Sequence, residues 1–243
     1  ASSNTLAPVP HRRRAAAGDL DGLQHGRGRY PARTMTTRVS FKSKTGSDVS
    51  GELAEPSGSD KVPAIVLLQE WWGLNDHIKS LVDRMAKEGF VVVAPDLYHG
   101  KVTKDPAEAS KLMSELDTAK AVQDIAGAVD FIRNHPRSNG KVGVMGFCMG
   151  GALSFASACF IEGLGAVVPF YGVPPADKVD YSKVTAPIMT HVAKHDEWVT
   201  LDKVEEIKKQ LEGRGHPIEV HVYDAQHAFV NDTRPEVYHA ENA

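Results

Sequence analysis

Cysteine is scarce in this sequence: Cys148 and Cys159 are the only two in 243 residues. If both lie on the helix expected after Cys148, their Cα atoms are roughly 16 Å apart, at about 1.5 Å per residue. A disulfide requires Cα atoms within about 7 Å, so the two thiols cannot pair. The chain therefore suits a reducing compartment, and we expect a cytoplasmic protein.

Long apolar runs and an excess of positive charge are also lacking. No stretch of roughly 18 consecutive apolar residues is present, so we predict no membrane-spanning helix. The formal net charge is -3, whereas binding to nucleic acid or to an anionic membrane depends on clustered positive charge. The content of 42% hydrophobic and 24% charged residues is ordinary for a globular protein. We therefore expect neither nucleic acid nor membrane as a partner.

Residues 1–34 differ in composition from the rest of the chain. They contain the basic run at residues 11–14 and almost no apolar periodicity, whereas an alternating segment begins directly after Met35. We interpret them as a disordered extension or an added leader, and we predict one domain over residues 35–243. The alternative is an organelle transit peptide, which would be rich in arginine and poor in acids. Asp19 and Asp21 count against that alternative.

Short apolar runs alternate with amphipathic segments along residues 35–243. A hairpin is expected over residues 37–55, and further strands at residues 63–68, 90–94, 141–145, 165–171, 186–192 and 218–223. Helices are expected at residues 76–87, 107–116, 120–134, 149–160 and 201–211. This alternation predicts an α/β fold, a mostly parallel sheet with helices on both faces in three α/β/α layers. Residues 228–243 show no convincing amphipathic pattern, so we expect no closing C-terminal helix.

A glycine-rich turn between a strand and a helix surrounds Cys148. Gly146 and Gly150 relieve crowding in a sharp turn, so that Cys148 projects above the carboxyl edge of the sheet, as in the nucleophile elbow of an α/β-hydrolase. The helix N-terminus favours a thiolate there, and the backbone N–H of Met149 is a candidate oxyanion donor. One alternative is a glycine-rich turn with a buried structural cysteine. A phosphate loop is the other, although both of its usual glycine spacings are absent.

Two later segments supply an acid and a histidine in the chain order that this fold uses. Asp196 follows the strand expected to end at Val192, and His227 follows the last strand. We predict that His227 accepts the proton of Cys148, and that Asp196 fixes the tautomer of His227 and stabilises its imidazolium. His195 is a lesser alternative for the base.

Glu70 and Trp71 end the first buried strand, at the edge where Cys148 is expected. Glu70 is predicted within hydrogen-bond reach of the thiol, with the N–H of Trp71 as a second oxyanion donor. The alternative for Glu70 is a solvated loop acid. Candidate residues for lining a substrate pocket, each of which could equally pack in the core, are Trp72, Tyr98, Phe147 and Trp198.

Together these stretches resemble the dienelactone hydrolase (carboxymethylenebutenolidase) family over nearly all of residues 35–231. The matching segments are residues 69–75, 94–98, 138–143, 146–153, 171–173 and 227–229. The resemblance implies a triad of Cys148, Asp196 and His227, with Glu70 helping to activate the thiol once substrate enters. It also implies hydrolysis of a lactone or activated ester through a thioester, without a cofactor or a metal. We expect a monomer or a small homo-oligomer.

The chain departs from the family on the substrate side. Well-known members of the family have an arginine that pairs with the substrate carboxylate, and Asn231 stands at that position here. They have a second arginine in the segment after residues 96–98, where this chain has only Lys101 and Lys104. Neither residue type reproduces the bidentate guanidinium contact. We therefore expect a flatter or less charged ester as the substrate, and we count Asn231 among the substrate-binding residues. The alternatives are a cysteine-dependent peptidase or acyl transferase, and a non-catalytic binding protein that retains the fold.

Overall fold

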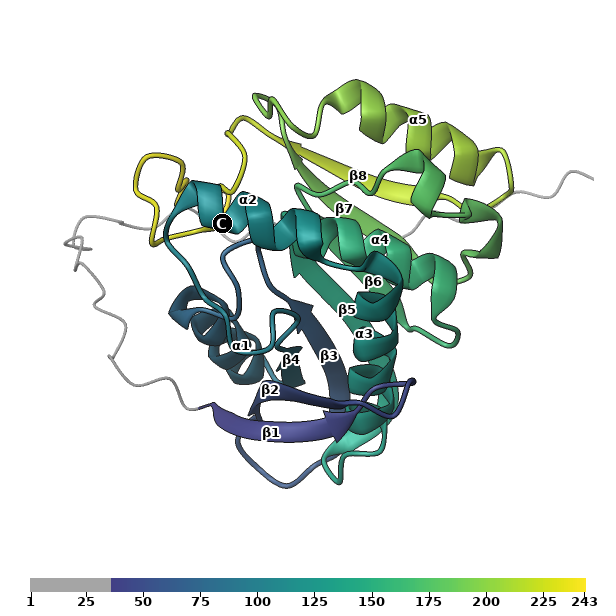
Figure 1. Cartoon of the computed structure of the whole chain (residues 1–243). Coiled ribbons are helices and arrows are strands. Elements are labelled where there is room, and N and C mark those ends of the chain that lie inside the picture. Colours follow the sequence, from purple (N-terminus) through teal and green to yellow (C-terminus); the bar gives the residue numbers. More distant parts are fainter. Residues whose placement is uncertain (1–35) are drawn as a thin grey trace, which may run out of the picture. The chain divides into compact units, whose positions relative to one another are not determined.

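One eight-stranded sheet organises the part of the chain that the structure describes. The computed structural model describes residues 36–243, so the prediction for residues 1–34 lies outside the described residues. The strand order is β1-β2-β4-β3-β5-β6-β7-β8 (Figure 1). The strands are β1 Thr37–Lys42, β2 Asp48–Ala54, β3 Val62–Leu68, β4 Val91–Pro95, β5 Ser138–Phe147, β6 Ala166–Phe170, β7 Ile188–Ala193 and β8 Ile218–Tyr223. The helices are α1 Asp76–Lys87, α2 Pro106–Glu115, α3 Thr118–Arg133, α4 Met149–Phe160 and α5 Leu201–Glu212, with short 3-10 turns at Ala176–Lys178 and Tyr181–Lys183.

The sheet is mostly parallel, as predicted. β1 pairs antiparallel with β2, and β2 antiparallel with β4, whereas the pairs β4–β3, β3–β5, β5–β6, β6–β7 and β7–β8 are all parallel. Because parallel strands end at the same edge, the segments that follow β3, β5, β7 and β8 meet there. Those segments contain Glu70, Cys148, Asp196 and His227 in turn.

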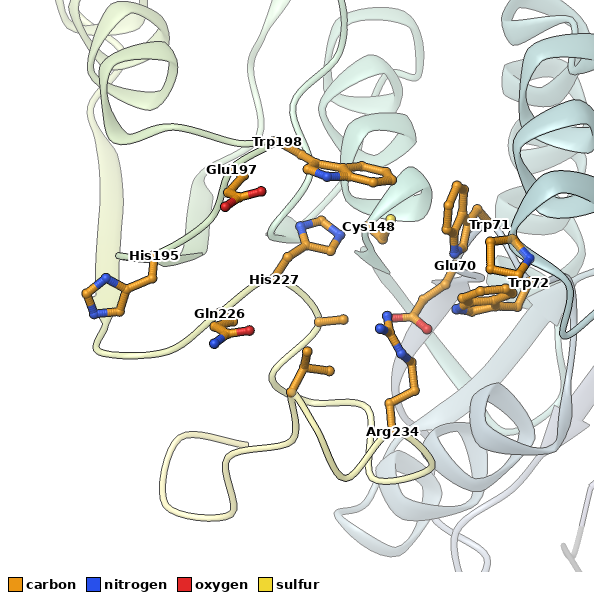
Figure 2. A pocket seen from close by; sticks show the side chains of 13 residues that line it. Glu70, Trp71, Trp72, Cys148, His195, Glu197, Trp198, Gln226, His227 and Arg234 are labelled. Atoms are coloured by element: carbon orange, nitrogen blue, oxygen red, sulfur yellow. The ribbon is translucent and has the colours of Figure 1, made fainter.

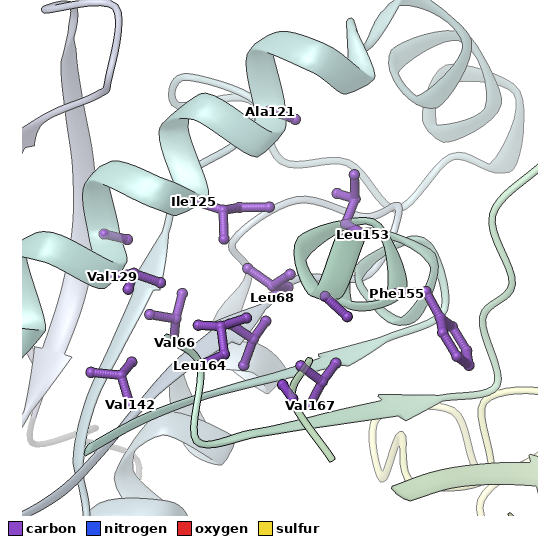
Figure 3. Packing of buried hydrophobic residues seen from close by; sticks show 14 of the residues in the cluster. Val66, Leu68, Ala121, Ile125, Val129, Val142, Leu153, Phe155, Leu164 and Val167 are labelled. Atoms are coloured by element: carbon purple, nitrogen blue, oxygen red, sulfur yellow. The ribbon is translucent and has the colours of Figure 1, made fainter. Parts of the chain in front are cut away.

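Two hydrophobic clusters show that helices cover both faces of the sheet. On one face, alternate residues of β3 such as Val66 and Leu68 pack with Ile125 of α3 and Leu153 of α4 (Figure 3). On the other face, the intervening residues of β3, such as Leu67, pack with α1. Since successive side chains of a strand point to opposite faces, β3 contributes to both clusters. The prediction of three α/β/α layers is confirmed.

Helix starts follow local capping signals. The side chain of Asn75 accepts a hydrogen bond from the N–H of Ile78 at 3.0 Å, and α1 has the predicted bounds. The helix α3 begins earlier than predicted because Asp117 caps it, accepting from the N–H groups of Ala119 and Lys120. Strand β5 is longer than predicted, since it pairs with β3 on one side and β6 on the other.

The segment after β8 contains turns and, within residues 224–243, no helix. Its anchor is Phe229, which is fully buried with its ring 5.2 Å from that of Tyr171 and 5.0 Å from that of Tyr223. Packing of Phe229 holds the preceding His227 against the edge of the sheet. Among residues 36–243, none of the helices has both the length and the apolar character needed to span a bilayer.

Candidate active site

The turn between β5 and α4 holds Cys148 in a strained backbone conformation. Its φ is 54° and its ψ is -115°, a region that costs a residue with a side chain about 1–3 kcal/mol. A Cβ at Gly146 would lie 2.2 Å from the carbonyl oxygen of Gly150, and a Cβ at Gly150 would lie 2.5 Å from that of Leu68. Both glycines are therefore required by close backbone contacts, as predicted.

A third glycine, Gly172 at the end of β6, supports the elbow from the other side. A Cβ there would lie 2.0 Å from the carbonyl oxygen of Cys148. The N–H of Cys148 donates to the carbonyl of Phe170 at 3.0 Å, which ties the elbow to the same strand end. Sequence reasoning did not assign this role to Gly172, although the residue lies within a segment of the family resemblance.

Asp196 and His227 form a hydrogen-bonded pair at the carboxyl edge of the sheet. The Nδ1–H of His227 donates to Oδ2 of Asp196 at 2.7 Å. The other oxygen, Oδ1, accepts from the N–H groups of Trp198 at 2.8 Å and Val199 at 2.9 Å. Burial raises the pKa of Asp196, but the bond from His227 and the two backbone donors outweigh it and lower the pKa below its usual value. The carboxylate is thus ionised and fixed in place.

The imidazole of His227 is strongly basic and faces Cys148. Burial lowers the pKa of His227, but the hydrogen bond to Asp196 and the proximity of Cys148 raise it to about 10. Its Nε2 is buried, lies beside Cys148 and has no hydrogen-bond partner of normal geometry among the described residues. Trp198 stacks on the ring at 5.5 Å between centroids (Figure 2). The free Nε2 is therefore directed at the reaction space and available for proton transfer.

Glu70 is almost completely buried and lines the same cavity as Cys148, but its hydrogen bonds go elsewhere. Oε2 accepts from Nδ2 of Asn231 at 2.6 Å, and Oε1 accepts from the hydroxyl of Tyr171 at 3.4 Å. Burial raises its pKa, against the opposing charges of His77 and other nearby groups. No hydrogen bond to the thiol is present among the described residues, so the predicted direct contact is absent in this state. The alternative of a solvated loop acid is wrong, because the side chain is 1% exposed.

Asn231 has a different place from the one predicted. It is 1% exposed, and its Oδ1 accepts from the backbone N–H of Thr233 at 3.1 Å and the hydroxyl of Thr233 at 2.6 Å. Its Nδ2 donates to Glu70, and Asn231 lines neither the polar cavity nor the apolar cavity described below. Asn231 is therefore a buried partner of Glu70 and not a free surface for substrate.

Two cavities meet at Cys148, and His227 and Trp198 line both. The first, here called the polar cavity, has a volume of about 590 Å³. Its other lining residues include Glu70, Trp71, Trp72, Glu197 and Arg234 (Figure 2). The second, here called the apolar cavity, has a volume of about 360 Å³. Its other lining residues include Met113, Met149, Ala152, Ala156, Val173 and Val199.

Known proteins share both the sequence pattern and the fold. The family model for dienelactone hydrolases matches residues 49–243. The protein usf of Aquifex pyrophilus is 39% identical over 215 residues, covering 84% of this chain and 91% of the relative. Carboxymethylenebutenolidase 1 of Cupriavidus pinatubonensis is 30% identical over 212 residues, covering 83% and 89%. A crystal structure from Klebsiella pneumoniae matches with a TM-score of 0.75 at 26% identity, covering 85% of this chain and 94% of that one.

The chain belongs to the dienelactone hydrolase family. It is accordingly a hydrolase of carboxylic esters or lactones with the α/β-hydrolase fold. The predicted family and fold class are confirmed.

Arg234 lines the cavity of Cys148 but was not among the residues predicted from the sequence. It lies three positions beyond Asn231 and lines the polar cavity, with its guanidinium 5.8 Å from the ring centre of Trp72. Its Nε donates to Glu236 at 2.8 Å. The polar cavity therefore contains an arginine, three positions along the chain from Asn231. The signal available in the sequence was a neighbouring arginine in the same loop.

Tyr98 and Phe147, which were predicted to line the substrate pocket, lie outside both cavities. The hydroxyl of Tyr98 donates to the sulfur of Met149 at 3.1 Å beneath α4, and the ring of Phe147 stacks on Phe170 at 4.8 Å. Both side chains are buried and line neither the polar nor the apolar cavity. Tyr98 packs in the hydrophobic cluster on the face covered by α3 and α4, and Phe147 packs in the cluster on the face covered by α1. The prediction that they line the substrate pocket is wrong.

The imidazole of His195 is bound to Asp224 at the rim of the polar cavity. Its Nε2 lies 2.7 Å from Oδ1 of Asp224, and its side chain is exposed at the rim of the polar cavity. His227 is therefore the better placed base. Within residues 36–243, no group of three or more His, Cys, Asp or Glu side chains is arranged to hold a metal ion.

Proposed function

We propose that this member of the dienelactone hydrolase family cleaves a lactone or an activated ester by forming a thioester on Cys148. The observation that supports it most is the Asp196–His227 bond of 2.7 Å, which leaves Nε2 of His227 free and directed at the cavity of the elbow cysteine. An acid that orients a histidine beside a nucleophile on a strained turn is the arrangement that covalent acyl transfer requires.

In the first half of the proposed reaction, the Cys148 thiolate attacks the carbonyl carbon and a C–S bond forms. The carbonyl electron pair moves to the oxygen, whose charge the N–H groups of Met149 and Trp71 stabilise. Met149 is the first residue of α4, so its N–H has no partner within the helix. When the C–O bond breaks, the imidazolium of His227 gives its proton to the leaving oxygen, or to the enolate once it has left, and becomes neutral.

In the second half, water resolves the thioester. Neutral His227 takes a proton from water, the resulting hydroxide adds to the thioester carbonyl, and the C–S bond breaks to release the acid and the thiolate. Asp196 stabilises the imidazolium that forms in this step, since its ionised carboxylate receives the Nδ1–H bond. The histidine returns to its starting charge, so no outside reactant besides water is needed.

Glu70 is proposed as the base for any Cys148 that is still protonated when substrate arrives. Because burial raises its pKa, its carboxylate binds a proton more strongly than an exposed one. In the resting state Asn231 and Tyr171 hold this carboxylate. Replacement of Glu70 by Gln is expected to slow acylation while deacylation continues, which single-turnover measurements separate.

Arg234 is proposed to receive an anionic group of the substrate in the polar cavity. Its Nε is bound to Glu236, which leaves the two Nη groups for a carboxylate. The Arg234→Gln variant is expected to raise KM about tenfold for a lactone that bears a carboxylate and to leave a neutral ester unaffected. Equal effects on both substrates would exclude this role. Arg133→Gln, on the surface of α3, is the matched control.

The direct test of the proposed function is intact-mass detection of an acyl adduct on Cys148 after exposure to a panel of lactones and p-nitrophenyl esters. Cys148→Ala is expected to abolish both adduct and turnover, with its circular dichroism spectrum unchanged. Cys159→Ala is the matched control, because burial raises the pKa of Cys159 to about 11 and keeps it a thiol. Full turnover by Cys148→Ala would refute the proposal.

A further inference from the structure

The apolar cavity beside Cys148 has a composition unlike that of the polar cavity. It contains side chains of Ala152 and Ala156 from α4, Val173 from the loop after β6, and Met113 from α2. Among its lining residues there is no Lys, Arg, Asp or Glu, whereas the polar cavity contains two glutamates and an arginine. An extended group of hydrocarbon therefore fits the apolar cavity, and a charged group does not.

Cys148 lies where the two cavities join. Trp198 and His227 line both cavities, so a substrate held at the sulfur extends into each of them. The indole of Trp198 stacks on the imidazole, and it also meets the edge of Trp71 at 5.2 Å. The two sides of a reacting carbonyl thus experience different surroundings, one aliphatic and one polar.

We propose that the apolar cavity binds the acyl chain, so that the natural substrates are esters or lactones with an apolar chain or ring on the acyl side. This inference rests on the proposed thioester route. The acyl group stays bonded to the sulfur after the leaving group departs, and it must be held away from the water that resolves it. The polar cavity, with Glu70 and Glu197, admits that water next to His227, whereas the apolar cavity offers it few partners.

The test is kcat/KM for two ester series. In the first, p-nitrophenyl acetate, butyrate and hexanoate lengthen the acyl chain. In the second, 4-alkylphenyl acetates place the same methylenes on the leaving group. For the native enzyme we expect a rise of about fourfold per methylene in the acyl series and little change in the other.

Two substitutions that change the size of the apolar cavity in opposite directions test whether the acyl chain of the substrate binds there. Ala152→Leu narrows the apolar cavity, and we expect kcat/KM on the hexanoate to fall about tenfold more than kcat/KM on the acetate. Val173→Ala widens it and moves the optimum to longer acyl chains. General damage to the fold would lower all rates together and could not move the optimum in opposite directions. Ala107→Leu, an exposed position of α2, is the matched control and should leave the profile unchanged.

Three outcomes overturn the inference. These are a flat acyl profile, a length response confined to the 4-alkylphenyl acetates, and equal loss on all esters in both variants. If acetate is hydrolysed in a manner that depends on Cys148 while the acyl profile is flat, only this inference fails. If no ester or lactone acylates Cys148, the proposed function fails and this inference fails with it.

Discussion

The contact between Asn231 and Glu70 gives a prediction with a definite pH dependence. Nδ2 of Asn231 donates to a carboxylate that is 1% exposed, and the other donor, the hydroxyl of Tyr171, lies at 3.4 Å. Asn231→Ala removes the shorter bond and leaves Glu70 with one long one. The ionised form of Glu70 is then less stable in the folded protein, so its pKa rises further.

The sign follows from the folded and unfolded pKa values of Glu70. Burial raises the folded pKa above the ordinary 4.5, so the contribution of Glu70 to stability is full below pH 4.5 and is lost as the pH rises through the folded pKa. The bond from Asn231 limits that loss because it favours the charged form. Such a bond contributes ~1.5–3 kcal/mol to a charged group and ~1 kcal/mol between neutral groups. Asn231→Ala should therefore destabilise the protein by ~1 kcal/mol more at high pH than at low pH.

Urea unfolding of the native chain and Asn231→Ala, at about pH 4 and about pH 8, measures this difference. The bonds from Thr233 to Asn231 are neutral, so their loss lowers the free energy of unfolding equally at both pH values. Glu70→Gln is the matched background, since it removes the charge while its amide keeps a hydrogen-bonding oxygen. In that background the pH dependence should disappear. If Asn231→Ala destabilises the protein equally at both pH values while Glu70 is present, the bond from Asn231 does not favour the ionised form of Glu70 and the prediction is wrong.

Two further predictions concern the elbow and the triad. Gly172→Ala places a Cβ 2.0 Å from the carbonyl oxygen of Cys148, so we expect a loss of ~1–3 kcal/mol in urea unfolding and of most esterase activity. Gly165→Ala, whose Cβ would meet only ordinary contacts from 3.5 Å, should cost much less, and equal losses would contradict this explanation. His227 has a folded pKa of about 10 against an ordinary 6.5, so its contribution to stability is full below pH 6.5 and is lost as the pH rises through 10. Asp196→Asn should weaken this decline, and an unchanged pH–stability curve would exclude the pair as its source.

Local signals explain most of what could be predicted from the sequence. Helix α1 has its predicted bounds because Asn75 caps its start and Gly89 follows its end, and both signals lie within a few residues of the helix. The proximity of Cys148, Asp196 and His227 was also predictable. Parallel strands deliver their carboxyl ends to one edge, so strand order alone brings the three segments together.

The partners of Glu70 could not be predicted in the same way. Its contact with Asn231 joins residues 161 positions apart, and Asn231 lies in a segment with no regular structure. The path of that segment depends on the packing of Phe229 against Tyr171. Local sequence preferences do not predict this contact, because the two residues are far apart in the sequence. The same path places Arg234 in the polar cavity. The sequence analysis noted only that Asn231 stands where an arginine was expected.

The sequence by itself predicted the strands and the elbow, and it singled out Cys148 as the proposed nucleophile, because hydrophobic periodicity and glycine spacing can be read from short segments. Only the tertiary structure decided which groups hold Glu70, where the arginine lies, and that Cys148 joins a polar cavity to an apolar one. Those features depend on contacts of about 3 Å between distant segments. Such contacts exist only after the sheet, α4 and the loop of His227 have packed together.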